Sequence, residues 1–194
     1  MQIRQAVKAN ARELAYLFSL AGEGLPEYLW SQRAKGNESP LDVGEQRARR
    51  EEGGFSYRHA QICSHRGRLM GMIVDYRLPD PYPLADLTDS PSVVQPLRRL
   101  EARVPGSWYI RALATYETSR GKGVASLLMS QAEASAIAEG CDEMSLIVAS
   151  ENRVARVFQE RRGFREVDAL PVVPWPGCQT GEDWVLMTRR LGEG

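Results

Sequence analysis

Two glycines that flank a lysine form the segment whose residue types and spacing are best suited to chemistry. Gly121, Lys122 and Gly123 follow Arg120, and an apolar stretch begins directly after them. Glycine adopts backbone conformations that a Cβ forbids. The first amides of a helix lack intrahelical partners, and together with the helix dipole they attract anions. This loop is therefore expected to bind a phosphate or pyrophosphate. Arg120 and Lys122 add positive charge beside it.

The same loop is also compatible with an ordinary exposed turn. It lacks the Lys-Ser/Thr ending of a P-loop and the third glycine of a dinucleotide-binding fingerprint. The usual nucleotide-binding classes therefore fit this segment poorly, and the neighbouring sequence has to decide between a turn and an anion site.

Regular elements are predicted on both sides of the loop. Residues 108–115 contain aromatic and β-branched side chains and predict a strand. Residues 124–138 carry apolar residues at spacings of three and four and predict a helix, which Gly140 ends. A second strand at 142–148 and a second helix from Asn152 to Gly163 repeat this order.

With this second half included, the pattern resembles the GNAT superfamily of N-acetyltransferases, which use acetyl-CoA. The family's loop pattern, Arg/Gln-x-x-Gly-x-Gly/Ala, matches Arg120, Gly123 and Ala125. Its later pattern, Asn-x-x-Ala-x-x-x-Tyr-x-x-x-Gly-Phe, matches Asn152, Ala155, Gly163 and Phe164, with Gln159 in place of the tyrosine. The two patterns start 32 positions apart (152 − 120), about what one helix, one strand and short loops need.

The resemblance implies an α/β fold with a central, mostly antiparallel mixed sheet, whose central strands splay apart and which helices flank. It implies acetyl-CoA as cosubstrate, with the pantetheine arm paired to the backbone of Leu113, Ala114 and Thr115. Asn152 is expected to touch that arm, and plain helix N-capping is its other possible role. The pyrophosphate is expected on Arg120, Gly121, Lys122, Gly123, Val124, Ala125 and Ser126.

Acetyl transfer to an amine needs a neutral amine, a polarised carbonyl and a proton for the leaving thiolate. Members of the family often carry a glutamate in the strand before the loop, but residues 108–115 contain no carboxylate. Gln159 cannot donate a proton in place of the tyrosine. Tyr116 and Glu151 are the candidate catalytic residues that remain. Catalysis by proximity, with proton transfer through water, is an open alternative.

The leading hypothesis is an acetyl-CoA-dependent N-acetyltransferase that moves an acetyl group to a primary amine of an unidentified acceptor, either a small molecule or a protein. The alternative is a non-catalytic acyl-CoA-binding sensor or regulatory protein, which the glutamine at position 159 favours. A phosphate-binding interaction module unrelated to CoA is a third class. Because members of the family it resembles are often dimers, a homodimer is one candidate assembly.

Composition limits the other classes. The chain of 194 residues suggests one domain, residues 1–194, with an insert at about 79–106. Basic and acidic residues balance at 25 each, which does not favour a nucleic-acid partner. The first residues form no apolar signal core, and no run reaches the roughly 20 apolar residues of a membrane span. A cytoplasmic protein is therefore expected. No metal site is expected, because the three cysteines and two histidines show no metal-ligand spacing.

Two further segments carry features that the resemblance does not explain. Residues 41–52 predict a charged helix, which either binds an anion or forms a solvated face with i,i+4 ion pairs. The insert at 79–106 contains six prolines and a helical pattern at 93–103. Long irregular segments often serve as binding loops. We expect this one to present Tyr82, Leu84 and Leu87 to the acceptor, and a packing insert or a dimer contact is the alternative.

The remaining elements follow from periodicity and chain breakers. Strands are expected at 2–7, 57–64, 69–78, 165–173 and 183–190, with a hairpin turn at Arg66-Gly67. Helices are expected at 11–20 and 25–30.

Overall fold

The structure is a computed structural model that describes residues 1–83, 85, 89–178 and 181–192. It contains two compact units, residues 1–76 with 111–132 and residues 77–110 with 133–194, which are described in turn. In the described part of the chain, seven strands form a sheet in the order β1-β2-β3-β4-β5-β7-β6, and helices accompany them. This is the mixed α/β architecture that the sequence predicts.

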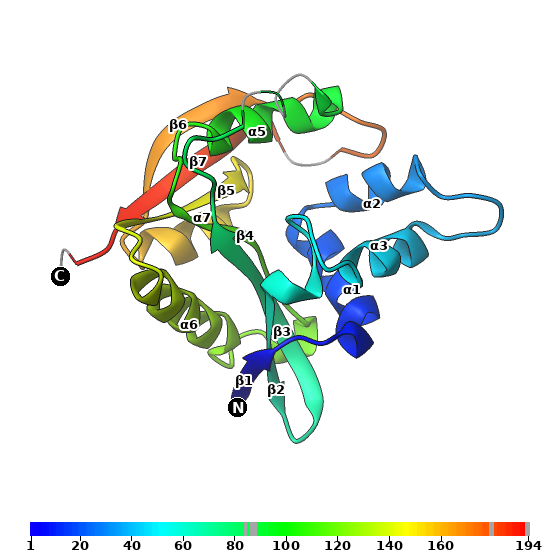
Figure 1. Ribbon diagram of the computed structural model, residues 1–194, viewed down its shortest axis with the longest axis horizontal. Coiled ribbons are helices and arrows are strands. Elements are labelled where there is room, and N and C mark those ends of the chain that lie inside the picture. Colours follow the sequence, from blue (N-terminus) through cyan, green and yellow to red (C-terminus); the bar gives the residue numbers. More distant parts are fainter. Residues whose placement is uncertain (84, 86–88, 179–180, 193–194) are drawn as a thin grey trace. The chain divides into compact units, whose positions relative to one another are not determined.

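Three helices and three antiparallel strands form most of the first unit. Figure 1 shows the helices, in blue and cyan, gathered together. They are α1 (Ala11–Ala21), α2 (Leu25–Ser31) and α3 (Pro40–Ala48). The strands are β1 (Gln2–Gln5), β2 (Ala60–His65) and β3 (Arg68–Arg77), and β2 pairs with both of the others.

Aromatic packing joins these helices. Phe18 of α1 stacks on Phe55 with ring centroids 4.0 Å apart, and on Trp30 of α2 at 6.3 Å. Helix α3 approaches closely because Gly44 has no side chain: a Cβ there would lie 2.5 Å from the Trp30 ring. Buried rings of this size contribute much of the hydrophobic stabilisation of a small core.

The hairpin of β2 and β3 turns where the sequence predicts it. Arg66 and Gly67 connect the two strands, with φ values of 50° and 75°. Positive φ at both central residues is the requirement of a type I′ turn, whose twist matches that of the strands it joins.

The second unit contains the other half of the sheet. Strand β7 (Asp183–Arg190) lies between β5 (Glu143–Ala149) and β6 (Arg165–Pro171) and pairs antiparallel with both. Among its described residues are the helices α5 (Gln95–Glu101) and α7 (Arg153–Glu160). No helix among the described residues is long and apolar enough to cross a lipid bilayer.

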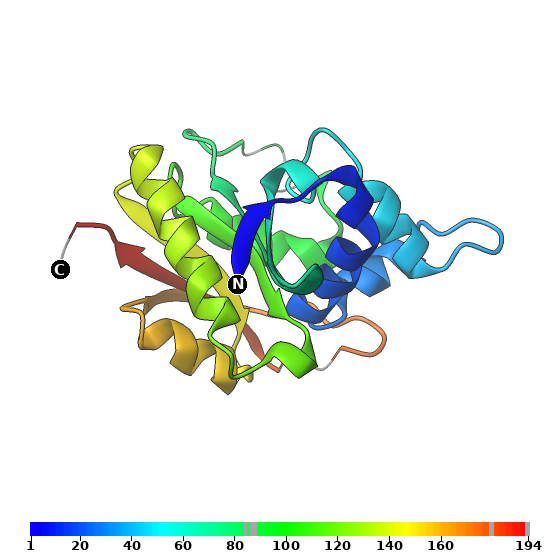
Figure 2. The same ribbon diagram turned by 90° about the horizontal axis from the view of Figure 1, so that it is seen from below.

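Two elements run from one unit into the other. Strand β4 (Trp108–Thr115) begins in the second unit, where Trp108–Ile110 pair parallel with β5, and it ends in the first. Helix α6 (Val124–Ala138) begins in the first unit and ends in the second, and Figure 2 shows it as one continuous helix. The bounds of both elements are those predicted from the sequence.

Buried polar contacts organise the insert expected at 79–106. Tyr82 is buried and donates its hydroxyl to the fully buried carboxylate of Glu101 (2.6 Å). Arg98 donates to the same carboxylate (3.0 Å) and to the Tyr82 hydroxyl oxygen (3.2 Å). The expectation that Tyr82 faces an acceptor is therefore wrong, since its ring belongs to the packing of the insert. Leu84 and Leu87, expected beside it, lie outside the described residues.

Two predicted boundaries also need correction. The helix expected at 41–52 ends at Ala48, and beyond it the carbonyl of Arg50 accepts a hydrogen bond from the hydroxyl of Ser56 (2.5 Å). Residues 57–59 form a 3-10 turn before β2, because the same Ser56 hydroxyl accepts from the amide of Arg58 (3.1 Å). Hydrogen bonds from serine side chains to nearby backbone groups compete in this way with the backbone hydrogen bonds of helices and β-sheets.

Candidate active site

The loop between β4 and α6 has the backbone geometry of an anion-binding site. After a 3-10 turn at Glu117–Ser119, Gly121 and Gly123 have φ values of 71° and 78°. Such left-handed conformations favour glycine. A Cβ built on either glycine meets no described atom within 4 Å, so close packing is not the reason for them. The glycines shape the loop and leave the space beside it open.

Helix α6 begins directly after this loop. The amide of Leu127 donates to the carbonyl of Gly123 (3.0 Å), which is the first hydrogen bond of the helix. The amides of Val124 and Ala125 precede that bond and have no acceptor within the helix. Buried Val124 and Leu128 hold the helix against the unit. The loop therefore ends at the positive end of a helix dipole, where anions are stabilised.

Two cationic side chains belong to the same loop. Arg120 and Lys122 are both exposed. The ammonium of Lys122 donates to the carbonyl of Thr118 (2.7 Å), which holds its charge close to the loop backbone. Ser126 follows, exposed in the first turn of α6. Backbone amides, two cations and an open surface together have the chemistry that a pyrophosphate requires, so the residues fit the expected cofactor.

The end of β4 leads into this loop with an alternating pattern. Ala112 and Ala114 are buried and belong to the core that includes α1. Leu113 and Thr115 are half-buried on the other face, as the pleat of a strand requires.

A glycine on β3, which the sequence analysis missed, fixes the position of this strand end. A Cβ at Gly71 would lie 2.7 Å from the carbonyl oxygen of Ala114 and 3.0 Å from side-chain atoms of Thr115 and Val124. One residue earlier, the carbonyl of Met70 accepts from the amide of Tyr116 (3.0 Å). A lone glycine inside a strand pattern signals such close approach, and residues 69–78 contained that signal.

Tyr116, the first catalytic candidate, lies between β4 and the glycine loop. It is half-buried, and its ring stacks on Tyr16 of α1 with centroids 5.6 Å apart. Burial first, and then the negative charge of Glu13, raise the pKa of the Tyr116 hydroxyl above its ordinary value of 10.0. At neutral pH this hydroxyl keeps its proton, so it is suited to donate a proton and not to accept one.

Glu151, the second catalytic candidate, and Asn152, a cofactor-binding candidate, belong to the second unit. Asn152 caps α7: its Oδ1 accepts from the amide of Ala155 (3.0 Å). The capping role that the sequence offered as an alternative is thus present, and contact with a cofactor stays a prediction. Glu151 is exposed, and its side chain lies beside Gly181 so closely that a Cβ on that glycine would overlap it.

Gln159 occupies the position where the resemblance expects a tyrosine. Its side chain is buried in α7, and its Oε1 has no hydrogen-bond partner among the described residues. A buried amide oxygen without a donor lowers the stability of the fold. The position therefore holds a polar group with unused hydrogen-bonding capacity and no dissociable proton.

Comparison with known proteins agrees with this geometry. The sequence model described as the acetyltransferase (GNAT) family matches residues 24–164, which is more than half of the chain. The matched stretch includes β4, the glycine loop, α6 and α7. A comparison with curated proteins found no match.

Solved structures share the fold over nearly the whole chain. An N-acetyltransferase from Staphylococcus aureus Mu50 is 17% identical, with a TM-score of 0.70 over 97% of this chain and 100% of that one. A polyamine N-acetyltransferase from Drosophila melanogaster is 15% identical, with a TM-score of 0.65 over 98% and 99%. A ribosomal-protein-alanine N-acetyltransferase from Brucella melitensis is 16% identical, with a TM-score of 0.61 over 98% and 100%. At these identities the likeness concerns the fold, and it confirms the predicted architecture.

Proposed function

The chain belongs to the GNAT family of acetyltransferases, and from that premise we propose that it transfers the acetyl group of acetyl-CoA to a primary amine. The observation that carries the proposal is the loop at Gly121 and Gly123, whose positive φ values leave an open surface at the N-terminus of α6. A cosubstrate with a pyrophosphate suits that surface.

Each segment has a role in this proposal. When bound, acetyl-CoA supplies the acetyl group as an activated thioester. The backbone of Leu113, Ala114 and Thr115 pairs with the pantetheine arm, and Asn152 touches it from the N-terminus of α7. The pyrophosphate binds to the segment of Arg120, Gly121, Lys122, Gly123, Val124, Ala125 and Ser126.

In this proposal, most of the rate enhancement comes from holding the reactants together and from a backbone amide. Holding the amine and the thioester together supplies on the order of 7–11 kcal/mol of the barrier reduction. A backbone amide of β4 is suited to stabilise the developing oxyanion. In this proposal Tyr116 donates the proton to the leaving thiolate, and Glu151 removes the proton of the amine. A cytoplasmic location, a homodimer and a single domain remain predictions from the sequence.

Substitution of Gly123 tests the cofactor site. Gly123→Asp adds a side chain and a negative charge where backbone amides meet phosphate, so CoA binding measured by calorimetry should be nearly abolished. Gly140→Asp is the matched control, since Gly140 also has a positive φ (68°) and open surroundings. It lies about 25 Å further along α6, at a rise of about 1.5 Å per residue. Equal CoA affinity in the Gly123→Asp variant, with the fold intact, contradicts the assignment of this loop.

Release of CoA in the presence of a panel of amines tests the reaction itself. Turnover that depends on both acetyl-CoA and an amine supports the proposal. Tight CoA binding without release, for every amine, would support an acyl-CoA-binding regulatory protein instead.

A further inference from the structure

One face of helix α1 carries a carboxylate, an aromatic ring and an apolar side chain in a row. Glu13, Tyr16 and Leu20 are three and four positions apart, so neighbouring Cβ atoms on this face are about 5–6 Å from each other. Tyr16 and Leu20 are 44% and 45% exposed, although most apolar side chains of α1 are buried in the core. The row therefore combines a negative charge with exposed apolar surface.

Tyr116 connects this row to the proposed cofactor segment. Its ring stacks on that of Tyr16, with centroids 5.6 Å apart and planes inclined by 17°. Tyr116 directly follows Thr115, the last residue of β4, and its amide donates to the carbonyl of Met70 on β3 (3.0 Å). All of these residues belong to the first unit. The row on α1 therefore lies beside the strand end that is proposed to pair with the pantetheine arm.

Helix capping does not explain the carboxylate of Glu13. It is the third residue of α1, where a capping-box carboxylate would accept from the amide of the N-cap residue, Asn10. That amide donates to the carbonyl of Val7 instead (2.8 Å). The Glu13 carboxylate has no hydrogen bond or ion pair with any residue that the structure describes. After burial, its charge is the next cause that raises the pKa of the Tyr116 hydroxyl, in agreement with its place beside the stacked rings.

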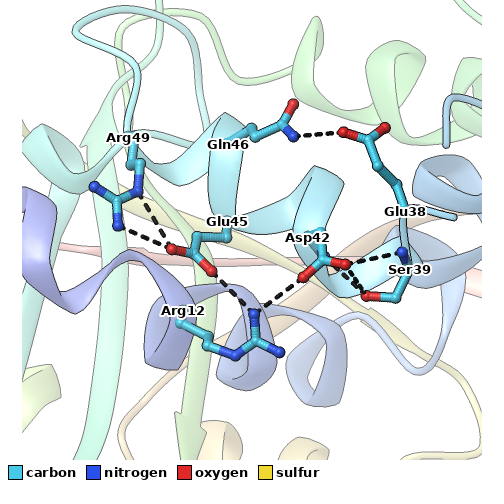
Figure 3. A network of polar contacts seen from close by, with 7 residues as sticks. All are labelled: Arg12, Glu38, Ser39, Asp42, Glu45, Gln46 and Arg49. Carbon is cyan, nitrogen blue, oxygen red and sulfur yellow. Dashed lines mark hydrogen bonds and ion pairs between the residues drawn. The ribbon is translucent and has the colours of Figure 1, made fainter. Parts of the chain in front are cut away.

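Arg12, which precedes this glutamate, is bound on another side of α1. Figure 3 shows its guanidinium between Asp42 and Glu45 of α3, at 3.1 Å from each carboxylate. Arg49 donates to the same Glu45 through Nε (3.3 Å) and Nη2 (2.9 Å). The solvated ionic face that the sequence offered as one reading of residues 41–52 is therefore present, and it holds Arg12 against α3.

A carboxylate beside an exposed aromatic ring has the chemistry of a site for an ammonium group. Carboxylates accept charge-assisted hydrogen bonds from ammonium, and the face of an aromatic ring attracts cations within about 6 Å. Leu20, one turn beyond Tyr16, offers apolar surface to a carbon chain. An anion would be repelled by Glu13. The row therefore favours a ligand with positive charge on an aliphatic chain.

The ammonium group held by this row is not the amine that reacts. Acetyl transfer needs a neutral amine, whereas a carboxylate and a ring face both stabilise the protonated form. Thr115 and Leu113 are one and three residues before Tyr116, about 3 and 10 Å away at about 3.3 Å per residue of strand. A ligand anchored beside Tyr116 therefore reaches the proposed cofactor segment with a second amine on a short chain.

We propose that Glu13 and the exposed ring of Tyr16, which Tyr116 holds in place by stacking, bind an ammonium group of the acceptor, so that this enzyme acetylates a diamine or a longer polyamine. The inference rests on the proposed function for the reaction and for acetyl-CoA, and it adds the chemical class of the acceptor. The bound ammonium group fixes one end of the acceptor, and the amine at the other end is delivered to the thioester.

Matched acceptors test the proposal. Unbranched diamines of increasing length are compared with monoamines and with ω-amino acids of the same length, in which a methyl group or a carboxylate replaces the second ammonium. The best diamine should have a kcat/KM about 10-fold or more above that of its monoamine, as expected for a charge-assisted contact. This difference exceeds the statistical advantage of a diamine, which has two equivalent amines. The ω-amino acid should be the poorest acceptor of the three.

Substitution of Glu13 should remove the preference for diamines. Glu13→Gln should raise KM for the diamine about 10-fold or more, and leave KM for the monoamine and for acetyl-CoA unchanged. Glu13→Lys reverses the charge and should make the ω-amino acid a better acceptor than the diamine. Glu27→Gln, at an exposed carboxylate in the first turn of α2, is the control and should change none of these constants. Both glutamates lie in the first turn of a helix, so the loss of a helix-dipole interaction affects both variants alike.

Tyr16→Leu tests the contribution of the ring. The substitution keeps an apolar side chain and removes the aromatic face, so KM for the diamine should rise about 3-fold, as the loss of an exposed cation–π contact predicts. The ratio of the diamine KM to the monoamine KM isolates this contact from any shift of Tyr116, because both acceptors react beside the same tyrosine. An unchanged ratio contradicts the role of the ring.

Contrary outcomes separate this inference from the proposed function. Equal use of diamines and monoamines overturns the ammonium site and leaves the N-acetyltransferase proposal in place. A preference for diamines that persists in Glu13→Gln also overturns it, because the ammonium group is then held elsewhere. Calorimetry with the diamines measures binding without turnover. Binding that is lost in Glu13→Gln, with no acetyl transfer by the wild type, supports the ammonium site and refutes the proposed function. Absence of both binding and transfer refutes both.

Discussion

Tyr116 shows how a residue's neighbours decide which proton chemistry it can perform. The ring is fixed by stacking on Tyr16, and burial raises the pKa of its hydroxyl above 10.0. A raised pKa keeps the acid form over the whole neutral range, so its ability to donate a proton should not change between about pH 6 and pH 9. Gln159, by contrast, has no proton to give.

Removal of the Tyr116 hydroxyl should therefore slow the chemical step. Tyr116→Phe is expected to lower kcat about 10²-fold or more, as the loss of a general acid does, and to leave CoA affinity unchanged. Steady-state kinetics and CoA calorimetry provide the two measurements. Tyr16→Phe is the matched control, because it keeps the stacked ring and removes the neighbouring hydroxyl. A fully active Tyr116→Phe variant together with a large gain from Gln159→Tyr would place the acid at position 159.

At the scale of elements, the contact between β3 and β4 controls the geometry of the cofactor segment. Gly71→Ala would bring a Cβ within 2.7 Å of the carbonyl oxygen of Ala114, a backbone atom that cannot rotate away. Overpacking of this kind costs about 1–3 kcal/mol, and the displaced strand end should also weaken CoA binding. Chemical denaturation and CoA calorimetry measure the two effects.

Gly44→Ala is the comparison for that prediction. Its Cβ would lie 2.5 Å from the Trp30 ring, so it also overpacks the first unit, but against a side chain and not against the backbone of β4. It should destabilise the protein and leave CoA affinity intact. If both variants lose stability and neither loses CoA affinity, the strand end does not hold the cofactor.

The network between α1 and α3 should make the stability of this pair depend on acid pH. The Ser39 hydroxyl (2.7 Å) and amide (2.9 Å), followed by Arg12, donate to Asp42 and lower its pKa from 3.8 to about 2. A carboxylate whose pKa is lower in the folded state stabilises the fold above its unfolded pKa and loses that contribution as pH falls through its folded pKa. The contribution of Asp42 is thus complete above about pH 4 and disappears toward pH 2.

Denaturation midpoints of the wild type and Asp42→Asn check this dependence. The difference between the two proteins should be constant from about pH 7 to pH 4 and should shrink as the pH falls further. Glu52→Gln, at an exposed residue outside the network, is the control and should show no such change. A difference that stays constant down to about pH 2 contradicts the prediction.

At the scale of the whole molecule, the proposed cofactor loop and the insert belong to different compact units of the chain. The glycine loop belongs to the first unit, and the insert belongs to the second. The insert buries a carboxylate and a tyrosine within its own packing. Tyr82 and Glu101 are thus engaged with each other, and the main contribution of the insert is expected to be to stability.

Tyr82→Phe tests that assignment. The variant removes the hydroxyl that donates to the fully buried carboxylate of Glu101, and a buried group that loses its partner costs about 1–3 kcal/mol. Denaturation should show this loss, and KM for acetyl-CoA and for the acceptor should not change. Tyr57→Phe removes the hydroxyl bond to exposed Glu51 and should cost much less. A raised KM for the acceptor in Tyr82→Phe would indicate that the insert contributes to the acceptor site after all.

The sequence by itself determined the elements whose causes are local. The bounds of β4, α6 and β7, the hairpin at Arg66-Gly67, and the positive φ of Gly121 and Gly123 follow from the preferences of adjacent residues. The family motifs lie in the same short segments, which is why the fold class and the acyl-transfer reaction were also predictable. The roles of the individual site residues stay predictions.

Tertiary structure alone decided which of two similar residues has a partner. Arg47 and Arg49 lie two positions apart, yet Arg49 is exposed and binds Glu45, whereas Arg47 is half-buried. Tyr82 was expected at a surface and is buried on Glu101 instead. Burial and charge depend on which distant segments pack together, and a linear pattern of residue types does not encode that packing residue by residue.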